Sequence, residues 1–259
     1  MYTLLYFSPT GNTLHLAKRL ASNLDIEKEQ FLPLEFTNPK DLQQKDNLIL
    51  MFSIHGFNAP RTVKRFVKNM PEGLYKNVHI IAVGCNTLWS NDAVSLDIKK
   101  ILKAKKYEVG IDEVLAMPLT FVMSFPEDAG KKSVSESENR IEEISTMISE
   151  NNSTNRKVKF KSKFITFIGK AEDPAARLFG LELHATKNCN SCKICWTRCP
   201  ENNIKPNKNN IPKFGLKCEM CMRCITECPQ KAITPYISKF MLIKNGYSLD
   251  NYLNSNEKK

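Results

Sequence analysis

The sequence predicts two parts: an α/β domain built on a doubly wound parallel sheet of five strands, and a smaller, cysteine-rich α+β domain. Two observations carry this prediction. Apolar runs of strand length alternate with helical segments through residues 1–118, which is typical of a parallel sheet. Eight of the nine cysteines then fall in two later runs, each with the spacing C-x2-C-x2-C-x3-C followed by proline. A length of 259 residues suits two domains.

The first strand is predicted over residues 2–7, YTLLYF, and the first helix over residues 14–24. The loop between them, SPTGNT, holds small hydroxyl residues and one glycine. Such a strand–loop–helix binds anions, because the amides at the helix N-terminus point at the anion and the hydroxyls donate to it. The loop has neither the lysine of a triphosphate site nor the G-x-G-x-x-G of a dinucleotide site. The alternative is an ordinary helix capped by Thr10 or Asn12.

Four more strands are predicted, at residues 29–36, 47–53, 77–84 and within 107–118, with helices at residues 61–70, 92–104 and 135–150. The run NLILMFS at 47–53 is apolar throughout, as in a strand buried on both faces. Ile141, Ile144 and Ile148 recur at helical spacing in the last helix. Ligands of such sheets bind beyond the carboxyl ends of the strands. We therefore expect the loops 8–13, 54–60 and 84–91 to form one site.

The loop SPTGNT resembles the FMN phosphate loop of flavodoxins, which has the form T/S-x-T-G-N-T. The matching residues are Ser8, Thr10, Gly11, Asn12 and Thr13. The resemblance implies a flavodoxin-like sheet in the order 2-1-3-4-5, and an FMN phosphate held by amides and hydroxyls alone.

The flavin ring is then expected between the loops 54–60 and 84–91. Phe57 and Trp89 are candidates to stack on it, with packing beneath their own loops as the alternative. The candidates at the ring edge are His55, Gly56, Asn58, Asn86 and Thr87. Cys85 is expected to be a buried apolar thiol.

The cysteine spacing is that of bacterial-type ferredoxins with two 4Fe-4S clusters. Three thiolates on a short loop cap one face of a cubane, so the fourth ligand comes from elsewhere; in this pattern it comes from the other run. Cluster 1 is thereby assigned Cys189, Cys192, Cys195 and Cys228, and cluster 2 is assigned Cys218, Cys221, Cys224 and Cys199. Zinc is the alternative, although closed zinc sites usually use C-x2-C pairs. Disulfides are not expected, because the N-terminus lacks a basic leader and a cleavage site, which predicts a cytoplasmic protein.

We expect a flavodoxin-like domain at residues 1–150, a linker with a helix at 151–184, a ferredoxin domain at 185–240 and a C-terminal tail at 241–259. In the linker, RKVKFKSKFITFIGK (156–170) mixes lysine with phenylalanine and isoleucine. We expect its apolar side to pack between the domains; the alternative is a basic amphipathic segment lying on a membrane surface. A helix is expected to start at Pro174. Apolar residues after each C-P pair, such as Ile204 and Ile233, are expected to shield the clusters from water.

The charge is unevenly distributed. Residues 1–150 hold 18 Lys and Arg against 19 Asp and Glu, whereas residues 151–259 hold 20 against 8. Anionic clusters and a phosphate would offset part of the basic charge, and the remainder suits an acidic redox partner protein. No recognition motif accompanies the charge, so no nucleic acid is expected. No apolar run reaches the length of a membrane span, so no stable membrane insertion is expected.

The order of the two parts, the HGFNAP loop and the pair CP-x2-NI and CP-x2-AI resemble the flavodoxin–ferredoxin fusion proteins of anaerobes, over residues 2–118 and 184–235. The resemblance implies an electron-transfer protein that passes single electrons between two 4Fe-4S clusters and FMN. Two alternatives stay open. One is an FMN and iron–sulfur oxidoreductase that reduces a small molecule at the flavin, and the other is a regulator whose partner binding depends on the clusters. No catalytic residue is assigned.

Overall fold

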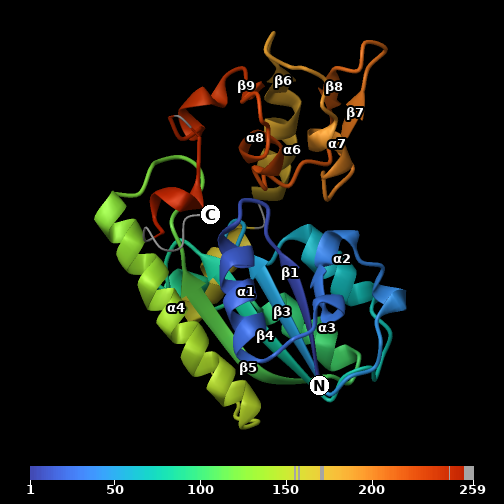
Figure 1. Ribbon diagram of the computed structural model, residues 1–259, viewed down its shortest axis with the longest axis vertical. Helices are drawn as coiled ribbons and strands as arrows, with labels where there is room; N and C mark the ends of the chain where they lie inside the picture. Colours follow the sequence, from blue (N-terminus) through green and yellow to red (C-terminus); the bar gives the residue numbers. More distant parts are fainter. Residues whose placement is uncertain (155, 157, 170–171, 245, 254–259) are drawn as a thin grey trace.

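The computed structural model describes residues 1–259 except 155, 157, 170–171, 245 and 254–259. Its larger part is a sheet of five parallel strands in the order β2-β1-β3-β4-β5 (Figure 1). The strands are β1 (Tyr2–Phe7), β2 (Phe31–Pro33), β3 (Asn47–Ser53), β4 (Asn77–Gly84) and β5 (Glu108–Ala116). The predicted five-stranded parallel sheet and its strand order are confirmed.

Helices cover both faces of this sheet. On one face, α1 (Asn12–Asn23) and α4 (Glu127–Ser149) bury a core that includes Leu4, Ile49 and Ile81. On the other face, α2 (Arg61–Asn69) and α3 (Leu96–Ala104) bury a core with the neighbouring strand residues Leu5, Leu50 and Ile80. Successive strand residues point to opposite faces, so a strand covered on both sides must be apolar throughout. This explains the uninterrupted apolar run of β3.

Several element bounds differ from those expected. The strand expected at 29–36 is limited to β2, with 3-10 turns on both sides; β2 is an edge strand that ends at Pro33, which has no amide to donate. The helix expected at 92–104 begins at Leu96, behind a 3-10 turn at Trp89–Asn91. The helix expected at 135–150 is α4, which starts eight residues earlier, just after Pro126, with Glu127 and Asp128 in its first turn. The two acidic side chains stabilise the helix there, because they interact favourably with the positive end of the helix dipole.

The cysteine-rich part is a repeat in which each element recurs 29 residues later, as Cys218 follows Cys189. The first copy holds β6 (Leu183–Ala185), α7 (Ile194–Thr197) and β7 (Ile204–Pro206); the second holds β8 (Pro212–Phe214), α8 (Arg223–Thr226) and β9 (Ile233–Pro235). β6 pairs with β9 and β7 with β8, both antiparallel. The first strand of each copy therefore pairs with the last strand of the other, which relates the copies by an approximate twofold.

The connection between the two parts contains α5 (Phe160–Gly169) and α6 (Glu172–Glu182). The prediction that the apolar side of residues 156–170 packs between domains is wrong for α5. Phe160 is 82% exposed and Phe167 is 70% exposed, whereas Ser162 and Thr166 are buried. The inward face is built of small residues because the backbone it meets is close: a Cβ on Gly169 would lie 2.0 Å from the carbonyl oxygen of Gly56.

The chain returns at its C-terminal end to the sheet part, as Figure 1 shows beside α4. Tyr252 and Leu253 are buried in the core formed by α1 and α4. Tyr252 fits there because α4 carries a glycine at the contact: a Cβ on Gly130 would lie 2.1 Å from the Tyr252 ring. Among the described residues, no helix is both long and apolar enough to cross a membrane.

Candidate cofactor sites

The cysteine-rich part has two cavities, each lined by four thiols. One is lined by Cys189, Cys192, Cys195 and Cys228, and the other by Cys199, Cys218, Cys221 and Cys224. The fold thus places the fourth cysteine of each run beside the first three of the other run. This exchange of cysteines follows the exchange of strands between the two copies.

The acidities of the thiols show the same grouping. Burial, together with the neighbouring Cys192, Cys189 and Cys228, raises the pKa of Cys195 to about 11. Burial also raises the pKa of Cys218 to about 11, with a contribution from Cys199. Grouped thiols become thiolates only when a cation compensates their charge, as a bound metal does.

The two sites lie next to each other. Burial raises the pKa of Cys224 well above its usual value, and the further causes are Cys221, Cys218 and Cys199 of its own site and then Cys195 of the other site. A negative charge on Cys195 of the first site therefore raises the pKa of Cys224 in the second site.

Hydrogen bonds from backbone amides to the cysteine sulfurs would stabilise a negative charge on these sulfurs. The amide of Asn203 donates to Sγ of Cys199 and the amide of Ala232 donates to Sγ of Cys228, each at 3.3 Å. These contacts are equivalent in the two copies, and hydrogen bonds to sulfur are one of the factors that set a cluster's potential. In the described part of the chain, no three His, Cys, Asp or Glu side chains are grouped closely enough for a single metal ion. The four thiols of each site line a cavity.

A third cavity, of about 390 Å³, lies at the carboxyl ends of the strands of the sheet. Its volume falls in the usual range of small-molecule sites. Seven of the predicted flavin-binding residues line it: Thr10, Asn12, Thr13, His55, Gly56, Phe57 and Asn86. The other five, Ser8, Gly11, Asn58, Thr87 and Trp89, are not among its lining residues.

The SPTGNT loop forms the turn into α1. Gly11 has a φ of 102°, a left-handed conformation that favours glycine, and Ser8 Oγ accepts a hydrogen bond from the Leu14 amide at 2.9 Å. Asn12 is held from two sides: its Nδ2 donates to the Pro118 carbonyl at 2.8 Å, and its Oδ1 accepts from the Tyr247 hydroxyl. The Thr13 hydroxyl is buried and has no hydrogen-bond partner among the described residues. Since buried polar atoms are nearly always paired, this hydroxyl is suited to donate to a bound anion.

The second loop forms a tight turn around His55 to Asn58, with positive φ at Gly56 and Phe57. Asn58 does not face the cavity, because its Nδ2 donates to the carbonyls of Gly56 and Thr166. Burial lowers the pKa of His55 to about 4, so its ring is neutral at pH 7. Ser53 Oγ and His55 Nε2 lie 3.1 Å apart.

The third loop differs from expectation in two ways. Trp89 is 40% exposed and lies outside the cavity, in the turn on which α5 packs. Cys85 is only partly buried and lines the cavity, so the expectation of a buried apolar thiol is wrong.

Two groups of cavity residues could not be identified from the sequence. Residues 118–121 follow β5, a loop without a recognisable motif, and Met220, Cys221 and Met222 come from the second cysteine run. The latter enter the cavity only because the two parts dock against each other.

A buried ion pair holds this docking. Arg223, between two cysteines of the second run, is 3% exposed and pairs with Glu35 of the sheet part, which is equally buried. Arg223 also donates to the Ser8 carbonyl at 3.2 Å. It therefore joins the cysteine-rich part directly to the SPTGNT loop.

The start of α2 makes a second contact with the same cysteine loop. Arg61 donates to the carbonyls of Lys217 and Cys218, both at 2.8 Å. The amide and hydroxyl of Thr62 donate to the carboxylate of Glu219. Burial, together with the neighbouring Glu201, raises the pKa of Glu219 to about 7. The contacts at Arg223 and Arg61 together fix the second thiol site against the sheet.

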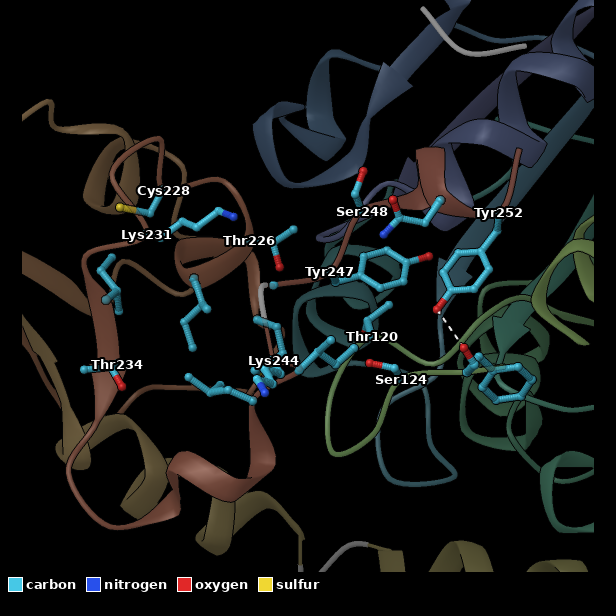
Figure 2. Close-up of a pocket in the computed structure, with 18 of the residues that line it drawn as sticks. Thr120, Ser124, Thr226, Cys228, Lys231, Thr234, Lys244, Tyr247, Ser248 and Tyr252 are labelled. Atoms are coloured by element: carbon cyan, nitrogen blue, oxygen red, sulfur yellow. Dashed lines mark hydrogen bonds between the residues drawn. The ribbon is translucent and has the colours of Figure 1, made fainter. Parts of the chain in front are cut away.

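A larger cavity, of about 970 Å³, lies between the cysteine-rich part and the C-terminal arm, which comprises residues 236–244 and 246–253 (Figure 2). Cys228 and Lys231 lie on one side of it, and Tyr247 and Tyr252 on the other. Tyr252 donates to the Phe125 carbonyl, which ties the arm to the loop before α4. Thr120 and Met222 line both this cavity and the 390 Å³ cavity, so the two adjoin.

No protein-family model and no curated protein matches the sequence. Solved structures match its first part. A flavodoxin from the domain Archaea is 14% identical, covering 57% of this chain and 98% of its own, with a TM-score of 0.39. A flavodoxin of Streptococcus pneumoniae is 18% identical, covering 56% and 97%, with a TM-score of 0.40. The Flv1 flavodiiron core of Synechocystis is 13% identical, covering 57% and 36%, with a TM-score of 0.38. At these values the similarities carry no argument about function.

Proposed function

We propose that this chain is an electron-transfer protein that binds FMN in the 390 Å³ cavity and a 4Fe-4S cluster in each thiol-lined cavity. One observation carries the proposal: Cys221 lines both the second thiol cavity and the flavin cavity. A ligand of the second cluster would thus stand in the wall of the flavin site. When bound, the clusters supply single electrons and FMN stores one or two, while the protein sets distances and excludes water.

The three proposed sites follow one another in space, and their order defines the two ends of the proposed electron-transfer path. The second thiol site adjoins the flavin cavity, and the first adjoins the second through Cys195 and Cys224. Cys192 of the first site is exposed, whereas Cys221 and Cys224 are more buried. The first site is therefore the end at which a redox partner protein would exchange electrons.

The surface near this end is basic. Residues 185–217 contain seven Lys and Arg and one acidic residue, Glu201, which pairs with Arg65 of the sheet part. Lys187 precedes the first thiol loop, Lys193 lies within it, and both are exposed. Complementary charge accelerates association and loses its effect as salt screens it, so we propose an acidic partner protein.

Replacing Lys187 and Lys193 with Glu is expected to slow reduction by an acidic one-electron carrier protein, because the new carboxylates repel it. Rapid mixing at low and high ionic strength would measure the rate, and the difference between variant and wild type should shrink with salt. The matched control is Lys100→Glu with Lys103→Glu, two exposed lysines on α3. Equal slowing by the two pairs would contradict a docking site at the first thiol loop.

A flavin-dependent reductase is the second candidate function. The 970 Å³ cavity favours it, because that cavity adjoins the proposed flavin site and has room for a small molecule. Anaerobic assays with small-molecule acceptors in large excess separate the two candidates. Sustained turnover supports the reductase, and reduction of protein acceptors alone supports the carrier.

Anaerobically purified holoprotein is expected to contain about eight iron, about eight sulfide and about one FMN per chain, because each thiol site would hold one four-iron cluster. Iron, sulfide and flavin assays on one sample check this. Stoichiometric zinc, or about four iron per chain, would contradict the pair of clusters.

Thr13→Val is expected to weaken FMN binding by roughly tenfold or more and to leave riboflavin binding unchanged. Valine keeps the shape of threonine but removes the unpaired hydroxyl, and a hydrogen bond to a charged group contributes about 1.5–3 kcal/mol. Fluorescence titration of the apoprotein with both ligands measures the two affinities. Thr87→Val is the control, since Thr87 is exposed and lies outside the cavity. Equal weakening of FMN and riboflavin would show that Thr13 does not contact the phosphate.

A further inference from the structure

Helix α5 presents an apolar stripe to solvent. Phe160, Phe164, Phe167 and Ile168 recur at helical spacing and are 82%, 58%, 70% and 51% exposed. The adjacent turn adds Leu88, which is 61% exposed. Soluble proteins rarely expose a continuous apolar patch of this kind unless it binds a partner or a membrane. The proposed electron transfer makes no use of it.

The outward orientation of this stripe is fixed by the opposite face of α5. Ser162 Oγ accepts a hydrogen bond from the Ala93 amide at 2.8 Å. At Thr166, the carbonyl accepts from Asn58 at 3.0 Å and the hydroxyl donates to the Phe57 carbonyl at 3.2 Å. Gly169 is so close to Gly56 that no larger residue fits. Rotating the phenylalanines inward would break these contacts, so their exposure is a specified feature of the fold.

The charged residues of the segment that carries the stripe are all positive. Residues 151–171 contain six Lys and Arg and no acidic residue. Lys159, Lys161 and Lys163 are exposed beside the phenylalanines. A short helix that carries protruding aromatic side chains flanked by lysines matches the pattern of interfacial helices, whose apolar face enters the lipid while the lysines meet anionic headgroups.

We propose that α5 docks this protein on the surface of membranes that contain anionic lipids. The large side chains protrude from a single helix, and a lipid interface accommodates such protrusions without a preformed groove. The lysines make the binding selective for negative headgroups. This inference goes beyond the proposed electron transfer and does not depend on either cofactor.

Co-sedimentation of the full-length protein with vesicles tests the proposal. Wild type is expected to bind vesicles of phosphatidylcholine with phosphatidylglycerol, to bind pure phosphatidylcholine vesicles more weakly, and to be released by salt. Phe164→Ser with Phe167→Ser is expected to lower the partition coefficient at least about tenfold, because both apolar side chains leave the lipid. Lys161→Gln with Lys163→Gln is expected to lower it roughly fivefold for each charge removed, on the anionic vesicles only.

The control is Ile237→Ser with Phe240→Ser. These side chains are 79% and 76% exposed and flank Lys239, but they belong to the C-terminal arm rather than to α5. The control variant should bind vesicles like wild type. The proposal is overturned if wild type does not sediment with anionic vesicles, if the α5 and control variants bind equally well, or if the phenylalanine changes abolish only self-association in gel filtration.

Discussion

Replacing Cys199 and Cys221 together with Ala is expected to lower the iron content from about eight to about four per chain, because both thiols line the same cavity. Replacing Cys199 and Cys192 together is expected to damage both clusters, because these thiols line different cavities. In sequence, however, Cys192 and Cys199 belong to the same run and Cys221 to the other. The two double variants therefore test whether the four ligands of a cluster are the four cysteines of one cavity or the four cysteines of one sequence run.

Iron and sulfide assays, with electron paramagnetic resonance of the reduced proteins, distinguish these outcomes. The variant that keeps one cluster should retain the signal of a single reduced centre. Cys85→Ala is the control, since Cys85 lies outside both thiol cavities, and it should keep about eight iron. If the pair Cys199 and Cys192 preserved one cluster and the pair Cys199 and Cys221 destroyed both, the fourth cysteine of each run would stay with its own run.

The sheet could be predicted because its signals are local. Apolar runs mark the strands that are buried on both faces, and their alternation with helices sets the parallel order. Bounds were less accurate where a strand lies at the edge, as at Pro33 in β2, or where a helix is polar at its start. The signal for the α4 start was nevertheless present, because Pro126 precedes Glu127 and Asp128.

The sequence does not show which face of α5 is buried. Its periodicity reveals an apolar stripe through Phe160, Phe164 and Phe167 and an opposite stripe through Ser162 and Thr166. An apolar stripe normally faces the core. Here the neighbouring loops approach so closely that only small residues fit between the backbones, and this long-range constraint leaves no local pattern.

The grouping of the thiols follows from the cysteine spacing, and part of the proposed flavin cavity follows from the SPTGNT and HGFNAP loops. The junction between the two parts does not follow from a motif. Met220 and Met222 occupy unremarkable positions between cysteines, yet they line the 390 Å³ cavity. Glu35 lies in a segment that gave no functional signal, yet it contacts Arg223 almost 190 residues later. The contact between the two parts needs residues from both, so no single segment of the sequence reveals it.

The pair of Glu35 and Arg223 supports a prediction about this docking. Glu35→Gln removes the nearest counter-charge of the buried Arg223 guanidinium and leaves only Glu227, whose carboxylate lies 3.7 Å from Arg223 Nε. Breaking a buried ion pair by removing one partner typically costs about 3–5 kcal/mol, and here the cost falls on the interface between the second thiol site and the SPTGNT loop. Iron and FMN contents should stay near those of wild type, because Glu35 lines neither kind of cavity.

Glu35→Gln is therefore expected to lower the stability of the docked arrangement and to slow electron transfer from the proposed clusters to the proposed flavin, since the wall shared through Cys221 is then held mainly by the contacts of Arg61 and Thr62. Stopped-flow absorbance of the flavin after rapid reduction of the clusters measures the rate, and thermal unfolding measures the stability. Glu29→Gln, at an exposed residue of the same part of the chain, is the control and should change neither. Glu35→Leu with Arg223→Met removes both charges and should recover most of the stability, because well-packed apolar residues often replace a buried ion pair without loss. An unchanged transfer rate in Glu35→Gln would show that the ion pair does not hold the second cluster site against the flavin site.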